Sequence, residues 1–351
     1  MFSRSPSNWA IATPRSGTWA EIGRRLTATK EVACFVAAVG PRLWRGHGPK
    51  ILFQRHGGIG DIICSFPAVL ALREKYPGAT IIYRCWHEFA AIVRMGQVAD
   101  QVVPSFGYPF VPSRCEGLFD LALRPQPTGQ PRVHVVDDFC RILGLTPRER
   151  QPRLIVPTAL ATSVGCRLQG LGARGPLVGF HTGPSWKVRE WTTTGWEELV
   201  AWLVHERHTT VLQLGTTIPT GGEPASIARI AGAVDWVGKL SLDETVASIQ
   251  ACDLFVGIDS GLLHIAGAVG TPCVGLFGPI DPALRLPPET PSIGVVADVP
   301  CLGCHHRSPQ LHWQDGCPYD IQCMRTLSVE RVTAACDRLL GLKNANARLR
   351  N

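Results

Sequence analysis

The sequence lacks an apolar run long enough to cross a membrane. A membrane-spanning helix needs about 20 consecutive apolar residues, whereas the longest candidate near the start, ACFVAAVG at residues 33–40, is far shorter. This segment follows charged residues and has no small-residue cleavage site placed as in a secretory signal. We therefore expect a cytoplasmic protein, with at most peripheral contact at the inner face of the plasma membrane.

The body of the chain also lacks a basic excess. The net charge is +7, yet residues 1–50 hold eight Lys/Arg and two Glu, while the remaining 301 residues hold 27 basic and 26 acidic side chains. A neutral body argues against a nucleic-acid partner, because phosphate binding needs concentrated positive charge. The basic extension at residues 1–48 suits either a solvated tail or an amphipathic helix that contacts an anionic membrane.

A disulfide framework is not expected either. The 13 cysteines are an odd number in a long chain without a secretory signal, and most stand among apolar residues. Four of them form a late cluster at residues 301–323, namely Cys301, Cys304, Cys317 and Cys323. Two close pairs joined by a loop fit a structural zinc or iron site with thiolate ligands, and the alternative is four reduced thiols.

The order of apolar patterns predicts two α/β domains. Strand-like and helix-like segments alternate over residues 51–143, with a helix expected at 62–75, and the alternation restarts over residues 176–277, with a helix expected at 225–232. The segment 145–175 is rich in Pro, Arg and Gly and is the best domain boundary. Such alternation is typical of a doubly wound parallel sheet, and 351 residues suit two domains. We place an N-terminal domain at residues 49–165 and a C-terminal domain at residues 174–341, which face each other across a cleft.

A glycine-rich loop follows the first predicted strand, but it is not a nucleotide-binding loop. The sequence GGIGD contains Gly58, Gly60 and Asp61, while Ile63 stands where a dinucleotide fingerprint needs its third glycine. No Gly-Lys-Ser/Thr follows either. Asp61 would repel a phosphate at this helix N-terminus. It is therefore either a first-turn acid that stabilises the helix or a general base at the cleft.

Two later loops contain candidate anion ligands. After the strand at 176–181 come Thr182, Gly183, Lys187 and Arg189, which combine backbone N–H groups with cationic side chains. After the strand at 254–258 come Asp259, Ser260, Gly261 and His264 at the start of a helix, where N–H groups can bind an anion. An ordinary basic loop, a capping aspartate and a structural histidine are the alternatives.

Taken in order, these segments resemble glycosyltransferase family 9, the ADP-heptose lipopolysaccharide heptosyltransferases. The resemblance covers residues 51–340 and rests on GGIGD with FPAVLALR, on the tryptophan-containing loop after GFHTG, on GKLSLDETVASIQACDLFVGIDSGLLHIAGAVGTP, and on LFGPIDP. It implies a GT-B fold with the acceptor at the N-terminal domain and the donor at the C-terminal domain.

The resemblance also implies roles for individual residues. Asp61 would deprotonate the acceptor hydroxyl in an inverting transfer, and the donor diphosphate would lie against Ser260, Gly261 and the helix of His264. Where the family often has Lys-x-Trp-Pro, this chain has Arg189-Glu190-Trp191-Thr192, so either Arg189 or Lys187 fills the lysine's role. Glu223 stands where the family often has an acid suited to the ribose.

We therefore expect an enzyme that moves heptose or a related sugar from ADP-heptose to a glycolipid or glycan acceptor. No catalytic cofactor is expected, and the sequence contains no Asp-x-Asp metal pair. A different sugar nucleotide, a protein acceptor, a non-catalytic sugar-nucleotide-binding subunit and a nicotinamide oxidoreductase are the alternatives, the last disfavoured by Ile63.

Overall fold

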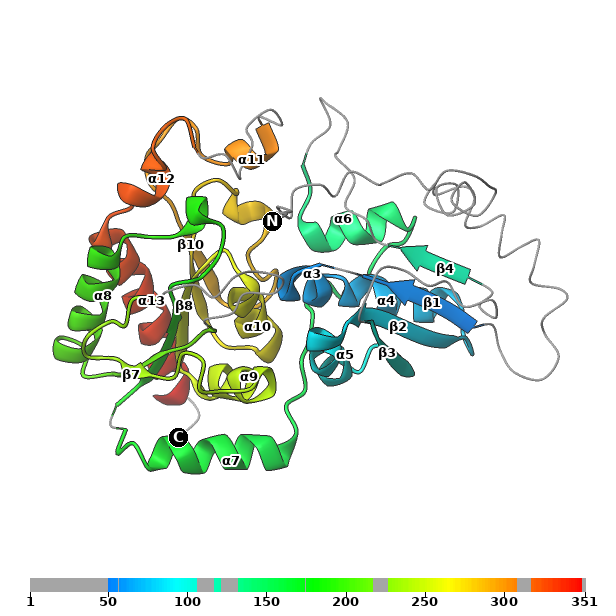
Figure 1. The fold of residues 1–351 in the computed structure, drawn as a ribbon, viewed down its shortest axis with the longest axis horizontal. Helices are drawn as coiled ribbons and strands as arrows, with labels where there is room; N and C mark the ends of the chain where they lie inside the picture. Colours follow the sequence, from blue (N-terminus) through cyan, green and yellow to red (C-terminus); the bar gives the residue numbers. More distant parts are fainter. Residues whose placement is uncertain are drawn as a thin grey trace, which may run out of the picture.

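The computed structural model describes residues 50–55, 57–105, 117–120, 132–173, 175–216, 227–307 and 317–348. These residues form two α/β halves, each with its own sheet, joined at a helical junction (Figure 1). All paired strands are parallel. The expected fold class, with two doubly wound α/β units, is confirmed. The extension at residues 1–48 lies outside the described residues.

The N-terminal sheet has the strand order β3-β2-β1-β4. Strand β1 is buried after its first residue, and in β2 buried and half-buried residues alternate. The strands are β1 (Lys50–Gln54), β2 (Thr80–Trp86), β3 (Gln101–Ser105) and β4 (Gly117–Asp120). The helices of this half are α3 (Ile59–Cys64), α4 (Phe66–Lys75), η1 (His87–Phe89), α5 (Ala90–Gly96) and α6 (Val135–Ile142).

The C-terminal sheet has the strand order β10-β9-β8-β5-β6-β7. Its two central strands are buried along their whole length, as expected when helices cover both faces of a parallel sheet. The strands are β5 (Leu177–His181), β6 (Thr210–Gln213), β7 (Val234–Asp235), β8 (Leu254–Ile258), β9 (Cys273–Leu276) and β10 (Ser292–Val295). The longer helices are α8 (Thr193–His205), α9 (Leu242–Ala251), α10 (Gly261–Val269) and α13 (Val329–Arg348), and the short ones are η2 (Lys187–Arg189), η3 (Pro282–Leu284), α11 (Cys304–Arg307) and α12 (Gln322–Arg325).

This strand order fixes where a ligand can bind. Read from β5 as the first strand, the C-terminal sheet has the 3-2-1-4-5-6 order of a dinucleotide-binding fold, in which the crevice opens at the carboxyl ends of strands 1 and 4. Those strands are β5 and β8, which pair directly. In the N-terminal sheet the order reverses between β1 and β4. The loops after β1, β5 and β8 therefore stand at the switch points of the two sheets.

The two halves share a packed junction. Helix α3 of the N-terminal half lies against α10 of the C-terminal half, and α7 (Thr158–Gln169), which follows the N-terminal half in the chain, packs on α9 beneath the C-terminal half (Figure 1). One hydrophobic cluster includes side chains from both sides, such as Ile63 and Leu263. A second cluster, around Trp196 and α13, belongs to the C-terminal half alone. The junction is therefore part of the protein's core.

Some predicted elements differ in the structure. Residues 227–232 are not helical, although a helix was predicted at 225–232; the backbone N–H of Ile230 and the carbonyl of Ala228 bond to the Gln213 side chain instead. Helix α7 lies within the segment 145–175, which was expected to be the domain boundary and for which no helix was predicted. The helix predicted at 62–75 is divided at Ser65 into α3 and α4, where Pro67 lacks a backbone donor. No helix in the described ranges is long and apolar enough to span a bilayer.

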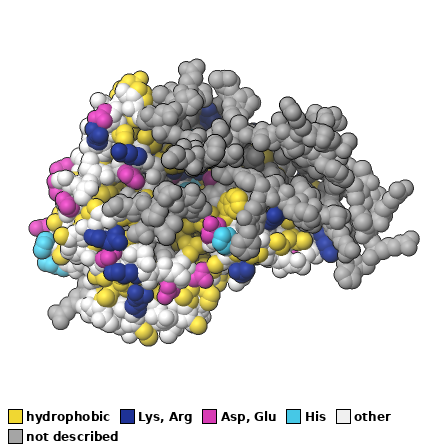
Figure 2. Space-filling model, in the orientation of Figure 1, with side chains coloured by type: hydrophobic (Ala, Val, Ile, Leu, Met, Phe, Trp, Pro, Cys, Tyr) yellow, Lys and Arg dark blue, Asp and Glu magenta, His cyan; other side chains and the backbone are white. Residues whose placement is uncertain are grey.

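The surface shown in Figure 2 has mixed charge. Lys/Arg and Asp/Glu side chains are interspersed over the described part of this face, which agrees with the near-neutral charge of residues 51–351. Nothing on the described part of this face resembles the continuous basic stripe that a nucleic acid would require.

Candidate functional site

The site begins with Asp61 on the first turn of α3, directly after the loop that leaves β1. Its carboxylate contacts two arginines: Arg55 Nη2 lies 2.9 Å from Oδ2, and Arg285 Nη1 lies 3.5 Å from Oδ1. Arg55 follows β1, whereas Arg285 follows η3 in the other half. Asp61 therefore sits between two cations, one from each half of the protein, and faces the junction.

These arginines determine the ionisation of Asp61. Burial favours the neutral carboxyl, but Arg55 and Arg285 together outweigh burial and hold the pKa of Asp61 below its usual value. Asp61 is thus a carboxylate near neutral pH. Loss of a cationic partner would raise the proton affinity of this carboxylate.

The second carboxylate, Asp259, ends β8 at the neighbouring switch point. It is buried, and its Oδ2 lies 3.4 Å from Arg189 Nη1, which also donates to the Asp259 carbonyl at 3.1 Å. Burial raises the pKa of Asp259, but Arg189 and Arg285 outweigh it and keep this pKa below the usual value. Asp259 therefore holds Arg189, from the loop after β5, beside the N-terminus of α10.

The structure distinguishes the two cations of the loop after β5. Lys187 is exposed, whereas Arg189 is largely buried and points toward Asp259. The Arg189 guanidinium also lies 4.1 Å from the centre of the Trp186 ring, a cation–π contact. Of the two alternatives left by the sequence, Arg189 is the one placed in the site. Thr182 and Gly183 lie in the same loop, and Gly183 has a left-handed φ of 135° beside the Glu190 carboxylate.

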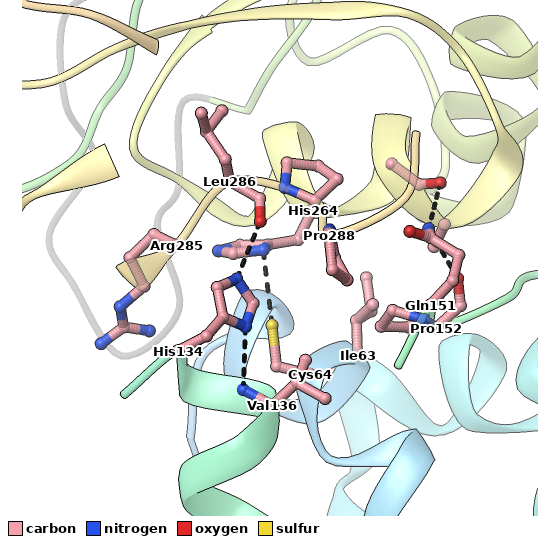
Figure 3. Close-up of a pocket in the computed structure, with 13 residues that line it drawn as sticks. Ile63, Cys64, His134, Val136, Gln151, Pro152, His264, Arg285, Leu286 and Pro288 are labelled. Carbon is pink, nitrogen blue, oxygen red and sulfur yellow. Dashed lines mark hydrogen bonds between the residues drawn. The ribbon is translucent and has the colours of Figure 1, made fainter. Parts of the chain in front are cut away.

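His264 joins the two helices at the junction. Its Nδ1 lies 3.4 Å from Cys64 Sγ (Figure 3). Burial lowers the pKa of His264 to about 4, so the ring is neutral at physiological pH. Burial raises the pKa of Cys64 to about 12, which makes it a protonated thiol. This pair is therefore an uncharged packing contact.

Gly60 has a steric reason to be glycine. A Cβ on Gly60 would stand 2.4 Å from Cδ2 of His264, and one on Gly261 would stand 2.9 Å from the Cβ of Ile59. These two glycines allow α3 and α10 to approach closely. Gly58, by contrast, is the N-cap of α3 with φ −67°, and a Cβ there would meet nothing within 4 Å. The roles of Gly58 and Gly60 in binding substrate remain predictions.

Substitution of these glycines tests the contact. Gly60→Ala should lower the free energy of unfolding by about 1–3 kcal/mol through overpacking, and it should separate Asp61 from the donor side. Gly58→Ala is the matched control, and its effect should stay within about 0.5 kcal/mol. Urea unfolding of both variants measures the difference. Equal stability of the two variants would contradict the contact as described.

Polar atoms at the start of α10 lack partners within the described protein. Ser260 is the N-cap of α10, yet its Oγ is buried without a hydrogen bond, and Asp259 Oδ2 has no hydrogen-bond donor although it pairs electrostatically with Arg189. Buried polar groups are normally satisfied. Together with the N–H groups at the N-terminus of α10, these atoms indicate a ligand position beside Ser260 and Gly261.

A narrow pocket lies at the junction (Figure 3), and neither Asp61 nor Ser260 is among the residues that line it. Side chains from both halves line it, including Cys64, His134, His264 and Arg285. His134 caps α6 by accepting from the Val136 N–H, and its Nε2 lies 2.8 Å from the Leu286 carbonyl. This hydrogen bond links the segment that contains Arg285 to the N-terminal half.

Sequence reasoning missed Arg55 and Arg285. Both are single arginines without a motif of their own, but Arg285 stands only a few residues after LFGPIDP. The motif LFGPIDP was recognised, and the arginine that follows it could have been sought there. Glu223, the predicted ribose ligand, lies outside the described residues.

The four late cysteines share one neighbourhood without forming a ligand set. Burial and the other cysteines raise the pKa of Cys323 to about 12, and burial with Cys301 and Cys317 raises that of Cys304. No three His, Cys, Asp or Glu side chains among the described residues are arranged to hold a metal. The metal site expected from the spacing is not formed in this geometry, and we derive no chemistry from a metal.

Comparison with known proteins found a match to one protein-family model. Residues 142–314 match the model of glycosyltransferase family 9 (heptosyltransferase). Lipopolysaccharide heptosyltransferase 2 of Escherichia coli K12 is 30% identical over 130 residues, which cover 36% of this chain and 37% of that protein. The chain thus aligns with little more than a third of this curated relative.

Solved structures match over a longer span. E. coli ADP-heptose lps heptosyltransferase II has a TM-score of 0.61 at 18% identity, covering 84% of this chain and 99% of the other. The dodecameric iron-containing heptosyltransferase TibC of enterotoxigenic E. coli, in complex with ADP-D-beta-D-heptose, has a TM-score of 0.65 at 20% identity, covering 83% and 76%. At these identities the likeness shows the fold.

Proposed function

We propose that the protein transfers heptose from ADP-heptose to a hydroxyl of a lipopolysaccharide-type acceptor, with inversion at the anomeric carbon, because residues 142–314 match the model of glycosyltransferase family 9 (heptosyltransferase). The observation that carries the proposal is that the junction has one carboxylate site on each side. Asp61 faces it from the N-terminal half, and Asp259 with the start of α10 faces it from the C-terminal half.

The donor diphosphate is assigned to the C-terminal side. The N-terminus of α10 offers N–H groups and the unsatisfied Ser260 Oγ, and Arg189 supplies positive charge. As the bond between the anomeric carbon and the diphosphate oxygen breaks, negative charge develops on the leaving ADP, and fixed donors and cations stabilise it.

The acceptor is assigned to the N-terminal side, where Asp61 takes the proton of the attacking hydroxyl. The acceptor oxygen forms the new bond to the anomeric carbon from the face opposite the leaving diphosphate. Asp61 and the α10 terminus belong to different halves, so each can serve one face of the sugar.

Ligand-dependent stabilisation tests the donor. The full chain should be stabilised against heat by ADP and ADP-heptose more than by UDP, GDP, CDP or NAD, because a ligand at 100 times its dissociation constant adds about 2.7 kcal/mol. Selective stabilisation by UDP or GDP would mean that the donor is a UDP- or GDP-linked sugar and not ADP-heptose. Stabilisation by none of them would contradict a nucleotide-sugar transferase.

We also propose that Cys301, Cys304, Cys317 and Cys323 bind a structural Zn or Fe once their side chains rearrange, since the described geometry does not hold them as a ligand set. The support is their spacing, their common neighbourhood and the fold shared with TibC, which is iron-containing. The purified protein should then contain about one metal ion per chain. Cys304→Ser should lose the metal, whereas Cys166→Ser, at an exposed thiol outside the cluster, should keep it. Elemental analysis decides, and metal-free wild-type protein would contradict the site.

Membrane contact through residues 1–48 remains a further part of the proposal. It is supported only by the basic composition of this extension, which would favour an anionic lipid-linked acceptor.

A further inference from the structure

We propose that Arg285 couples donor binding to the availability of Asp61: its guanidinium pairs with Asp61 in the free protein and moves to the diphosphate when the donor binds. Arg285 is a positioning residue in this view, because it acts on the reaction through Asp61. The inference rests on the proposed function and adds to it a reason why the two substrates must act in order.

The two oxygens of Asp61 have different partners. Oδ2 forms the closer contact, at 2.9 Å to Arg55, which belongs to the same half of the protein. Oδ1 forms the looser contact, at 3.5 Å to Arg285 from the other half. If Arg285 leaves, Arg55 still holds Oδ2 and orients the carboxylate. Oδ1 then becomes the oxygen that an acceptor hydroxyl can reach.

Arg285 stands within the electrostatic reach of both carboxylates. Its side chain is only 15% exposed, and its charge is stabilised by Asp61 and by Asp259 together. Figure 3 shows that Arg285 leaves the backbone next to Leu286, whose carbonyl is fastened to His134. The backbone is therefore held in place while the long side chain has two anionic positions between which it can turn.

A bound diphosphate would change the balance between these positions. Asp259 already pairs with Arg189, so the donor side of the free protein has no excess of negative charge. A diphosphate beside Ser260 adds at least two negative charges there, whereas Asp61 carries one. Since charge-assisted bonds between arginine and phosphate are among the stronger polar contacts, the guanidinium should favour the diphosphate.

Release of Arg285 also improves the base. The charged groups that face Asp61 from the surrounding elements are Arg55, Arg285 and, farther away, Arg189 and Asp259. The neutral groups are His264, Cys64 and Tyr83. Loss of one cation raises the proton affinity of the carboxylate. Asp61 would thus be a poor proton acceptor without donor and a better one with it.

A binding cycle with inorganic pyrophosphate and ADP tests this coupling without any turnover. Calorimetry would compare the full-length wild type with Asp61→Asn, Arg285→Gln and the double variant. Asp61→Asn should bind both ligands about fivefold tighter, because Arg285 no longer has to leave a partner whose pairing contributes about that factor. Arg285→Gln should bind about tenfold weaker or worse.

The double variant is decisive. If Asp61 affects binding through Arg285, the gain from Asp61→Asn should vanish in the Arg285→Gln background. An equal gain in both backgrounds would mean direct repulsion between Asp61 and the diphosphate, and it would overturn the proposal. Arg285→Lys should retain part of the coupling. It replaces Arg285→Gln in the binding cycle if Arg285→Gln does not fold. Arg331→Gln, at an exposed arginine paired with Asp298, should bind as the wild type does.

The two ligands separate this inference from the proposed function. Coupling with pyrophosphate, but no preference for ADP over other nucleoside diphosphates, would support Arg285 and contradict the assigned donor. Binding of ADP without coupling would support the donor and overturn the role of Arg285. A wild-type protein that binds neither ligand would contradict both.

Discussion

Replacing Asp61 by asparagine should lower turnover by about two to four orders of magnitude, the usual contribution of a general base, without weakening ADP binding. Asparagine keeps the size of the side chain but cannot take the proton of the acceptor hydroxyl. Steady-state rates with ADP-heptose and an acceptor glycan measure the effect, and calorimetry measures ADP affinity.

Asp298→Asn is the matched control, because Asp298 forms its ion pair with Arg331 on the outer surface. It should turn over as the wild type does. If Asp61→Asn retained nearly full turnover, Asp61 would be a helix-stabilising acid and the assigned mechanism would be wrong.

Replacing Arg189 by methionine should have the largest effect on stability. Asp259 is 4% exposed, and removal of its partner would leave a buried carboxylate without its nearest cation, at a cost of about 3 kcal/mol. Donor affinity should fall as well, because Arg189 is the cation of the β5 loop that reaches the start of α10.

Lys187→Met is the matched control for Arg189→Met, since the two cations are two residues apart and only Arg189 is largely buried. Its effect on stability should stay within about 0.5 kcal/mol. Thermal unfolding with and without ADP measures both quantities. If Lys187→Met weakened ADP binding more than Arg189→Met, the assignment of the phosphate cation would have to be reversed.

Much of the fold could be predicted, because buried parallel strands and their covering helices have strong apolar patterns. Helix α7 was missed because its sequence, TALATSVGCRLQ, buries only Val164 and Leu168 and stands among prolines and glycines. The helix predicted at 225–232 was wrong over its described part because a single buried side chain, Gln213, competes for the backbone there. Tertiary contacts of this kind leave no periodic pattern.

The residues of the site that belong to sequence motifs could be predicted, and the isolated arginines could not. Asp61, Arg189, Asp259 and His264 were selected from loops that follow strands, and the structure brings them to one junction. The choice between Lys187 and Arg189 depended on η2, which turns one inward and the other outward. Arg285 could not be paired with Asp61 from sequence, since 224 positions separate them.

The close approach of α3 and α10 also bears on inhibitor design. The glycine–imidazole contact between Gly60 and His264 brings the residue that would face the acceptor next to the helix that would hold the diphosphate. A compound that joins an ADP fragment to an acceptor-like fragment would therefore need only a short bridge between them. A long flexible tether would lose conformational entropy on binding without gaining contacts, so potency should decrease as the spacer is lengthened.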